Sequence, residues 1–288
     1  MSTQVPRLLA GLVDDAAVFP PGSATLPDAV AAHRRYRVSW YAGLVGPLLV
    51  PASAVVAGEL RPLVDPGEGL VVGLIGDTGV GGLPAALSAL AAGGVTARQI
   101  EVAVARRGED PQPGLAELLR LAGQPGGVDV YAELPLTFGL MAALDTVAAA
   151  RADGVPVAAK FRTGGLAAEL FPTPVELAAV ICACRDRELP FKLTAGLHHA
   201  VRHRDAETGF THHGFANVLA ATLAAVDGAE VDEVAALLAA TDPEPLAEPA
   251  RAARDADRPL WVGFGSCSIE EPLTDLIRLG LVNGGYEA

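Results

Sequence analysis

The chain contains only two lysines, Lys160 and Lys192, although arginines bring its basic residues to 21. Each lysine follows a proline within a short apolar segment, 156–161 or 190–195, that predicts a β-strand. A buried ammonium group is costly unless it has a partner or a chemical purpose. Two amines on neighbouring strands would lower each other's pKa, and a neutral amine can attack a carbonyl carbon. The lysines therefore predict imine chemistry, and a structural ion pair with Glu133 or Glu101 remains the alternative.

Other polar residues lie at or just after predicted strands, where barrel enzymes place their working groups. Arg162 is two residues beyond Lys160, so both side chains should face one cavity and bind a carboxylate or phosphate of the substrate. The Gly/Ser turn at 263–268 predicts either a phosphate site or a tight connection into the next helix. The remaining candidates at strand ends are Asp14, Asp15, Glu101, Glu133, Gly265, Ser266 and Ser268.

Five of the six histidines lie between His198 and His213, in a segment that follows the strand of Lys192. Three interpretations remain open for them. Two or three can bind a divalent metal together with Asp14, Asp15 or Glu133. They can face solvent, with His198 buried at the barrel rim, or His198 and His199 can serve as acid–base groups beside Lys192. The three cysteines lack metal-ligand spacing, and we expect reduced, structural thiols.

Eight short apolar runs alternate with Ala/Leu-rich helical segments at about 30 residues per unit, which is typical of parallel β/α units. Eight such strands favour an α/β fold, a (β/α)8 TIM barrel, over residues 1–288 as a single domain. An open doubly wound sheet is disfavoured, because no Gly-x-Gly-x-x-Gly follows the first strand. A long insertion at 196–258 is expected between the seventh and eighth strands, and long loops are often functional. The expected strands are 8–13, 43–50, 69–75, 99–105, 128–134, 156–161, 190–195 and 259–264.

The formal net charge of −13 argues against nucleic acid or an anionic membrane as a partner. The first residues lack the basic and apolar regions of an export signal, so a cytoplasmic location is expected. The uncharged stretch 40–58 is interrupted by prolines and glycines, and it predicts a strand, a loop and a helix rather than a membrane span. A homo-oligomer is compatible with the sequence.

Residues 160–164, Lys-Phe-Arg-Thr-Gly, match the Lys-x-x-Thr-Gly motif of class I aldolases, and the chain resembles their deoxyribose-phosphate aldolase group. Lys192 resembles that group's second lysine, and 12–30, 99–105, 130–136 and 263–268 resemble other segments of it. The resemblance implies that Lys160 forms the imine, Lys192 perturbs its pKa, and Glu101 transfers protons where the family has Asp. Thr163 and Gly164 complete the motif. The chain departs from the family at Arg162, at Glu101 and in its histidine-rich segment.

The leading hypothesis is an aldolase-type lyase that forms an imine on Lys160 with a small anionic aldehyde or ketone and needs no cofactor. One alternative is a metal-dependent hydrolase or lyase that uses the histidines. A second is a barrel without catalytic activity that binds a metabolite. The sequence does not name the substrate, the direction of the reaction or the oligomeric state.

Overall fold

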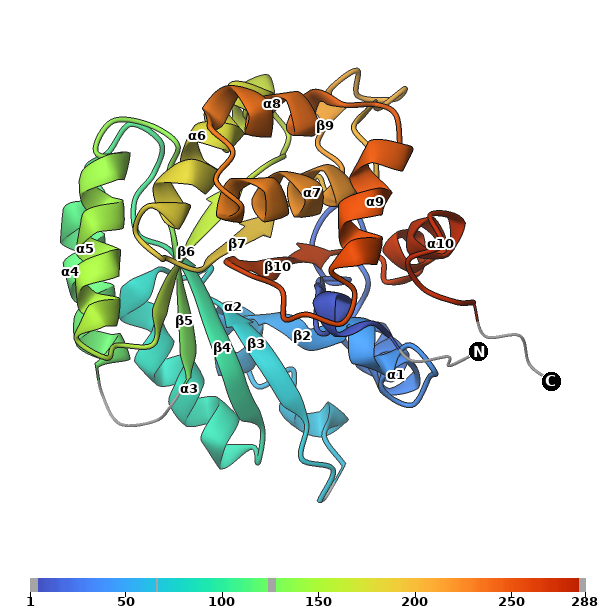
Figure 1. Ribbon diagram of the computed structural model, residues 1–288. Helices are drawn as coiled ribbons and strands as arrows, with labels where there is room; N and C mark the ends of the chain where they lie inside the picture. The colour runs from blue at the N-terminus through green and yellow to red at the C-terminus, as the bar shows by residue number, and fades with distance from the viewer. Residues whose placement is uncertain (1–4, 66, 124–127, 285–288) are drawn as a thin grey trace. The chain divides into compact units, whose positions relative to one another are not determined.

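The structure is a computed structural model that describes residues 5–65, 67–123 and 128–284 (Figure 1). Eight of its strands form a closed barrel in the order β1-β10-β7-β6-β5-β4-β3-β2. This confirms the predicted α/β barrel of eight strands. The strands are β1 (Val13–Asp15), β2 (Val45–Pro51), β3 (Val71–Ile75), β4 (Thr96–Ala103), β5 (Asp129–Glu133), β6 (Val157–Arg162), β7 (Phe191–Thr194) and β10 (Trp261–Ser266).

The first strand differs from the prediction. Residues Arg7–Leu9 form a short 3-10 helix, and β1 begins only at Val13. Gly11 lies between the two elements with a φ of 57°, a left-handed conformation that interrupts a strand. Asp14 and Asp15 therefore belong to the strand itself rather than to the loop after it.

The chain divides into two compact units, which we describe separately. Unit 1 contains residues 1–15, 34–46 and 162–288, and unit 2 contains residues 16–33 and 47–161, each as far as the structure describes them. Helix α1 (Leu26–Arg37) and strands β2 and β6 each have residues in both units, and Arg162 is the residue of β6 that belongs to unit 1. The single domain expected over 1–288 stays a prediction.

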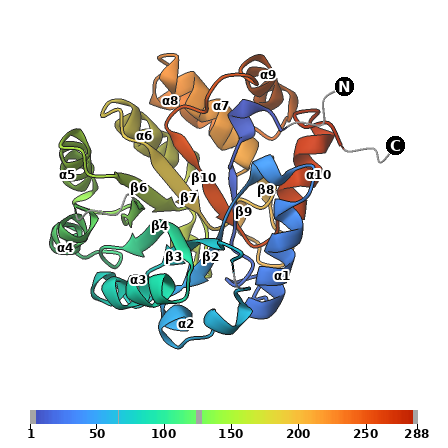
Figure 2. The ribbon, with the colours of Figure 1, turned by 90° about the horizontal axis from the view of Figure 1, so that it is seen from below.

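Unit 2 is built from β/α repeats, as the alternating sequence pattern predicts. Strands β3 to β5 are each followed by a helix, and these helices lie on one side of the strands (Figure 2). Helix α3 has a proline in its first turn and ends where Gly94 adopts a φ of 71°, which are common start and stop signals. Parallel pairing places Gly73 beside Gln99, Glu101 beside Tyr131, and Glu133 beside Lys160. The helices of this unit are α2 (Ala52–Val56), α3 (Leu83–Ala92), α4 (Gln112–Ala122) and α5 (Leu140–Ala152).

Unit 1 contains β1, β10 and β7, which pair in parallel in that order. Between β7 and β10 the chain forms an antiparallel hairpin and three helices (Figure 1). Trp261, Phe264 and Phe215 stack in the core, with ring centroids 5.8 and 5.7 Å apart. The further elements are α6 (Pro174–Arg185), β8 (His203–Arg204), β9 (Thr211–His212), α7 (Phe215–Val226), α8 (Val231–Ala239), α9 (Glu244–Ala252) and α10 (Glu270–Arg278).

The stretch 40–58 forms a 3-10 turn, β2 and α2, which confirms the predicted strand and helix; α2 begins directly after β2, without the predicted loop between them. Among the helices that the structure describes, none combines the length and the apolar character needed to cross a bilayer.

Candidate active site

Four polar residues of unit 2 form one buried group, the Lys160 cluster: Gln99, Glu101, Glu133 and Lys160. The Lys160 ammonium lies 2.8 Å from a carboxylate oxygen of Glu101 and 2.8 Å from one of Glu133. These side chains come from three consecutive strands, β4, β5 and β6, and Glu133 pairs directly with Lys160 in the strand register. The Lys160 and Glu101 side chains are 4% and 1% exposed, and that of Glu133 is 16% exposed. The structure thus contains the ion pair with both glutamates that the sequence allowed.

The electrostatics of the Lys160 cluster differ from the expectation. Burial alone lowers the pKa of Lys160, but the charges and hydrogen bonds of Glu101 and Glu133 outweigh it, and the pKa is raised. The sequence predicted a lowered pKa, because a second ammonium group on the neighbouring strand and desolvation would both act in that direction. Two carboxylates at 2.8 Å reverse the sign, because a nearby opposite charge stabilises the ammonium form.

Gln99 belongs to the Lys160 cluster and was missed by the sequence analysis. Its Nε2 donates a hydrogen bond of 2.7 Å to Glu101 Oε1, and both residues are buried. A side chain at Gly73, its neighbour on β3, would bring a Cβ within 3.0 Å of the Gln99 Cγ. The one available signal was the spacing, because Gln99 precedes Glu101 by two residues and so faces the same side of β4.

The second lysine forms its own buried pair within unit 1. Lys192 on β7 donates to the Asp14 carboxylate on β1, and both residues are at most 4% exposed. Gly46 packs against this carboxylate so closely that a Cβ there would overlap Asp14 Oδ1. Asp15 is also buried, at 1% exposed. The partner of Lys192 is thus an acid from β1, and the expectation that both amines open into one cavity stays a prediction.

The Thr-Gly part of the Lys-x-x-Thr-Gly motif connects the ends of two strands within unit 1. Thr163 Oγ1 donates a hydrogen bond of 2.6 Å to the carbonyl of Ala195, which follows β7. Ala195 has a φ of 66°, a conformation that costs a non-glycine residue free energy and persists only where its surroundings hold it. A Cβ at Gly164 would approach the Gly196 Cα to 3.0 Å. Arg162 is exposed at the end of β6, and its role in binding an anion stays a prediction.

Two histidines of the segment after β7 contact acids of α10. His198 Nδ1 lies 3.3 Å from Glu271 Oε2 and 3.6 Å from Cys267 Sγ. His199 Nδ1 lies 3.3 Å from Asp275 Oδ2. Burial lowers the pKa of His198 below its ordinary value, although Glu271 acts in the opposite direction. The His198 side chain is 19% exposed, so it is partly buried rather than the buried histidine of an otherwise solvent-facing segment that one interpretation expected.

The other histidines of this segment have structural contacts. His203 and His212 stack with ring centroids 5.3 Å apart in the β8–β9 hairpin. His213 is fully buried, and its Nε2 lies 2.7 Å from the Pro172 carbonyl. Within residues 5–65, 67–123 and 128–284, no three His, Cys, Asp or Glu side chains are arranged to hold a metal ion.

The serines after β10 shape a turn. Ser266 Oγ donates a hydrogen bond of 2.7 Å to the Ser268 carbonyl, and Ser268 Oγ accepts one of 3.2 Å from the Glu271 amide. These contacts fit the tight connection into α10, and glutamates occupy the first turn of that helix. Gly265 pairs with Asp14 and Thr194 in the sheet. Phosphate binding at this turn stays a prediction.

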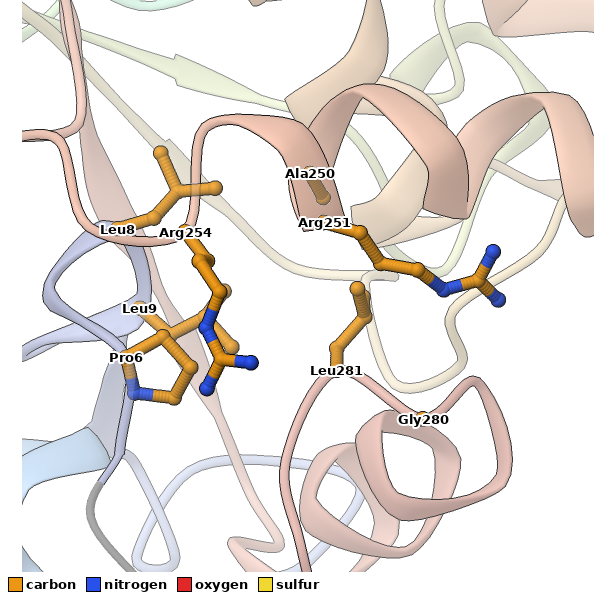
Figure 3. Close-up of a pocket in the computed structure, with 8 residues that line it drawn as sticks. All are labelled: Pro6, Leu8, Leu9, Ala250, Arg251, Arg254, Gly280 and Leu281. Atoms are coloured by element: carbon orange, nitrogen blue, oxygen red, sulfur yellow. The ribbon is translucent and has the colours of Figure 1, made fainter. Parts of the chain in front are cut away.

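A small surface hollow in unit 1, with a cavity volume of only about 10 Å³, is separate from these groups (Figure 3). Its lining comes from the residues before β1, from α9 and the turn after it, and from the turn after α10, and it contains neither lysine and none of the histidines. The lining residues are Pro6, Leu8, Leu9, Ala250, Arg251, Arg254, Gly280 and Leu281.

Comparisons with known proteins identify no relative: no family model matches the chain, and neither a curated protein nor a solved structure matches it. The fold and the two buried lysine–carboxylate groups therefore carry the functional argument.

Proposed function

We propose that the protein is an aldolase-type lyase in which Lys160 forms an imine with a small aldehyde or ketone. The observation that supports this most directly is the contact of one buried amine with two carboxylates at 2.8 Å. An imine-forming lysine needs nearby groups that remove and return protons, and carboxylates serve this purpose. Glu101 and Glu133 lie within hydrogen-bond distance of the reacting nitrogen, as such groups must.

Lys160, Glu101 and Glu133 can carry the proton transfers of this reaction without another residue. One glutamate takes a proton from the Lys160 ammonium, and the neutral amine attacks the carbonyl carbon of the substrate. Within the carbinolamine one proton moves from nitrogen to oxygen, the protonated glutamate gives this oxygen its second proton, and water leaves to give the protonated imine. A carboxylate next removes the proton from a hydroxyl group on the substrate carbon that is β to the imine. The bond between the α- and β-carbons then breaks, and its electron pair moves to the imine nitrogen, which leaves an enamine on Lys160. An aldehyde leaves in this step.

The charge of the Lys160 cluster bears on the substrate. Two carboxylates face one ammonium, so the fully ionised cluster has a net charge of −1. An anionic group would be repelled close to the reacting nitrogen. We therefore place the carboxylate or phosphate of the expected anionic substrate at the end away from its carbonyl.

Borohydride trapping tests the proposal. The protein is incubated with acetaldehyde or dihydroxyacetone phosphate and then reduced, which converts an imine to a stable secondary amine. Peptide mass spectrometry should place the adduct on Lys160. Lys160→Arg should abolish it, whereas Lys192→Met, which removes the other buried lysine, should leave the label on Lys160.

The pH dependence of trapping provides a second readout that keeps Lys160 in place. Transfer of the proton to a glutamate gives a rate that does not depend on the bulk pH, and loss of the proton to solvent adds to it. Because the carboxylates raise the Lys160 pKa, this second route should make trapping faster as the pH rises from neutral. Glu133→Gln removes one of the two raising charges, so its trapping curve should move to lower pH. The proposal fails if no probe gives an adduct at any pH, or if the adduct persists after Lys160 is replaced.

A further inference from the structure

Three side chains of unit 1 that the proposed lyase chemistry does not use meet next to α10: Cys267, His198 and Glu271. Cys267 Sγ lies 3.6 Å from Nδ1 and 4.0 Å from Nε2 of His198, within the range for a sulfur hydrogen bond. His198 Nδ1 also lies 3.3 Å from Glu271 Oε2. These residues come from two segments 69 positions apart in the chain. A thiol, an imidazole and a carboxylate are the groups that nucleophilic cysteine sites combine.

The local backbone holds the thiol in place. Cys267 follows directly after β10, between two serines that bond to each other. Ser266 Oγ donates to the Ser268 carbonyl at 2.7 Å and accepts from the Ser268 amide at 3.3 Å. Cys267 is half-buried, so a small reagent can reach it. The turn thus fixes the thiol against His198 while leaving it accessible.

We propose that Cys267 is a nucleophilic thiol site for small uncharged electrophiles, with His198 as its base and Glu271 orienting the imidazole. Nδ1 is the nitrogen nearer to the sulfur, at 3.6 Å, and it is also the one that contacts Glu271. When Nδ1 carries the proton and donates it to Glu271, Nε2, 4.0 Å from the sulfur, is the nitrogen left to accept the thiol proton. The thiol proton moves to Nε2, and the thiolate attacks. With an α,β-unsaturated carbonyl compound, sulfur bonds to the β-carbon and the proton is delivered to the α-carbon.

The state of His198 agrees with this role. Its burial favours the neutral imidazole, which is the form that can accept a proton, and Glu271 stabilises the imidazolium formed afterwards. Other titratable groups act around this site and contribute to its pH response. Those that face it or lie on the neighbouring elements are His199, His203, His212, Tyr36, Glu270 and Asp275.

Local charge sets the preference for uncharged reagents. Glu270 and Glu271 occupy the first turn of α10, and Asp275 follows one turn later. These carboxylates repel an anionic reagent near Cys267. The site should therefore discriminate iodoacetamide from iodoacetate, which alkylate thiols by the same displacement of iodide and differ in charge.

The other two cysteines supply an internal control. Cys182 and Cys184 lie in α6 and are 3% and 0% exposed. Burial raises the pKa of Cys182 and raises that of Cys184 to about 12, so neither forms a thiolate readily. In the folded protein, labelling should be confined to Cys267.

The test measures the rate at which iodoacetamide alkylates Cys267 in the full chain at pH 7, by peptide mass spectrometry. The rate for glutathione, whose thiol is unperturbed, is the reference. A free thiol is only a few per cent thiolate at this pH, so Cys267 should react about tenfold faster. His198→Ala should remove this advantage, and His203→Ala, which removes an imidazole of the same segment, should not. Iodoacetate should react more slowly relative to iodoacetamide than it does with glutathione, and Glu271→Gln should reduce that difference. Acrylamide should also add to Cys267.

Two results would overturn the inference: labelling of Cys267 no faster than glutathione, or an unchanged rate in a folded His198→Ala protein. If that variant does not fold, the pH–rate profile of the wild type decides, because a thiol with an ordinary pKa contradicts the proposed proton acceptor. None of these outcomes depends on Lys160, so they leave the proposed lyase function untouched.

Discussion

Replacing Lys160 with methionine should destabilise the protein strongly at pH 7. The substitution keeps a long apolar stem but removes the ammonium that faces Glu101 and Glu133. Removing one partner of a buried ion pair typically costs about 3–5 kcal/mol, because the remaining charge stays desolvated. Glu101 should account for most of this cost, since it is 1% exposed, whereas Glu133 at 16% retains some contact with water. We therefore expect a loss of about 3–5 kcal/mol in the free energy of unfolding.

Urea denaturation at pH 7 and pH 5 measures this loss and its cause. In Lys160→Met the folded-state pKa of Glu101 should rise above its unfolded value, since burial disfavours the charged form. The native state then binds more protons than the unfolded state, so the variant regains stability as the pH falls through that raised pKa. The matched control, Lys160→Met with Glu101→Gln and Glu133→Gln, should be more stable than the single variant at pH 7 and should lack this pH response. A loss below about 1 kcal/mol, or one independent of pH, would refute a buried ion pair.

Two further predictions concern groups outside the Lys160 cluster. Burial lowers the pKa of His213 to about 4. As the pH falls from 6.5 the unfolded state therefore binds the proton first, and about 3 kcal/mol of stability should be lost by pH 4. Urea titrations at several pH values should show this loss in the wild type and not in His213→Gln. Gly46→Ala should cost about 1–3 kcal/mol, because its Cβ would overlap the Asp14 carboxylate that holds Lys192. Gly81→Ala, whose Cβ meets nothing closer than 3.7 Å, is the control, and equal thermal midpoints would contradict the argument.

The barrel was predictable because its signals are local. Each strand is a short apolar run, and helices such as α3 and α6 carry start signals that do not depend on distant residues, including the Thr173–Glu176 capping box of α6. The first strand was misplaced for an equally local reason. Gly11 falls within the apolar run 8–13 and was therefore counted as a strand residue. Its left-handed φ of 57°, which interrupts the strand, cannot be inferred from periodicity.

The candidate site was predictable only in part. Lys160, Glu101 and Glu133 could be grouped because parallel strands bring their carboxyl-terminal ends together. The direction of the Lys160 pKa shift could not be inferred, since it depends on which charges lie at 2.8 Å. The pairing of Lys192 with Asp14 spans 178 positions, and no spacing rule indicates it. Cys267 was expected to be a structural thiol and His198 an acid–base group, because nothing in the spacing of residues 69 positions apart indicates that they are in contact.

A raised pKa does not exclude Lys160 from imine chemistry, because that pKa describes loss of the proton to solvent. Transfer to Glu101 or Glu133 moves the proton by one hydrogen bond of 2.8 Å and leaves the net charge of the cluster unchanged at −1. No charge has to enter or leave the buried region, so the transfer avoids the desolvation cost that release to water would involve. In the proposed mechanism the two glutamates thus hold the amine protonated at rest and also supply the base that frees it when a carbonyl group enters. Arginine cannot replace lysine in this scheme, because its guanidinium does not give up its proton in proteins.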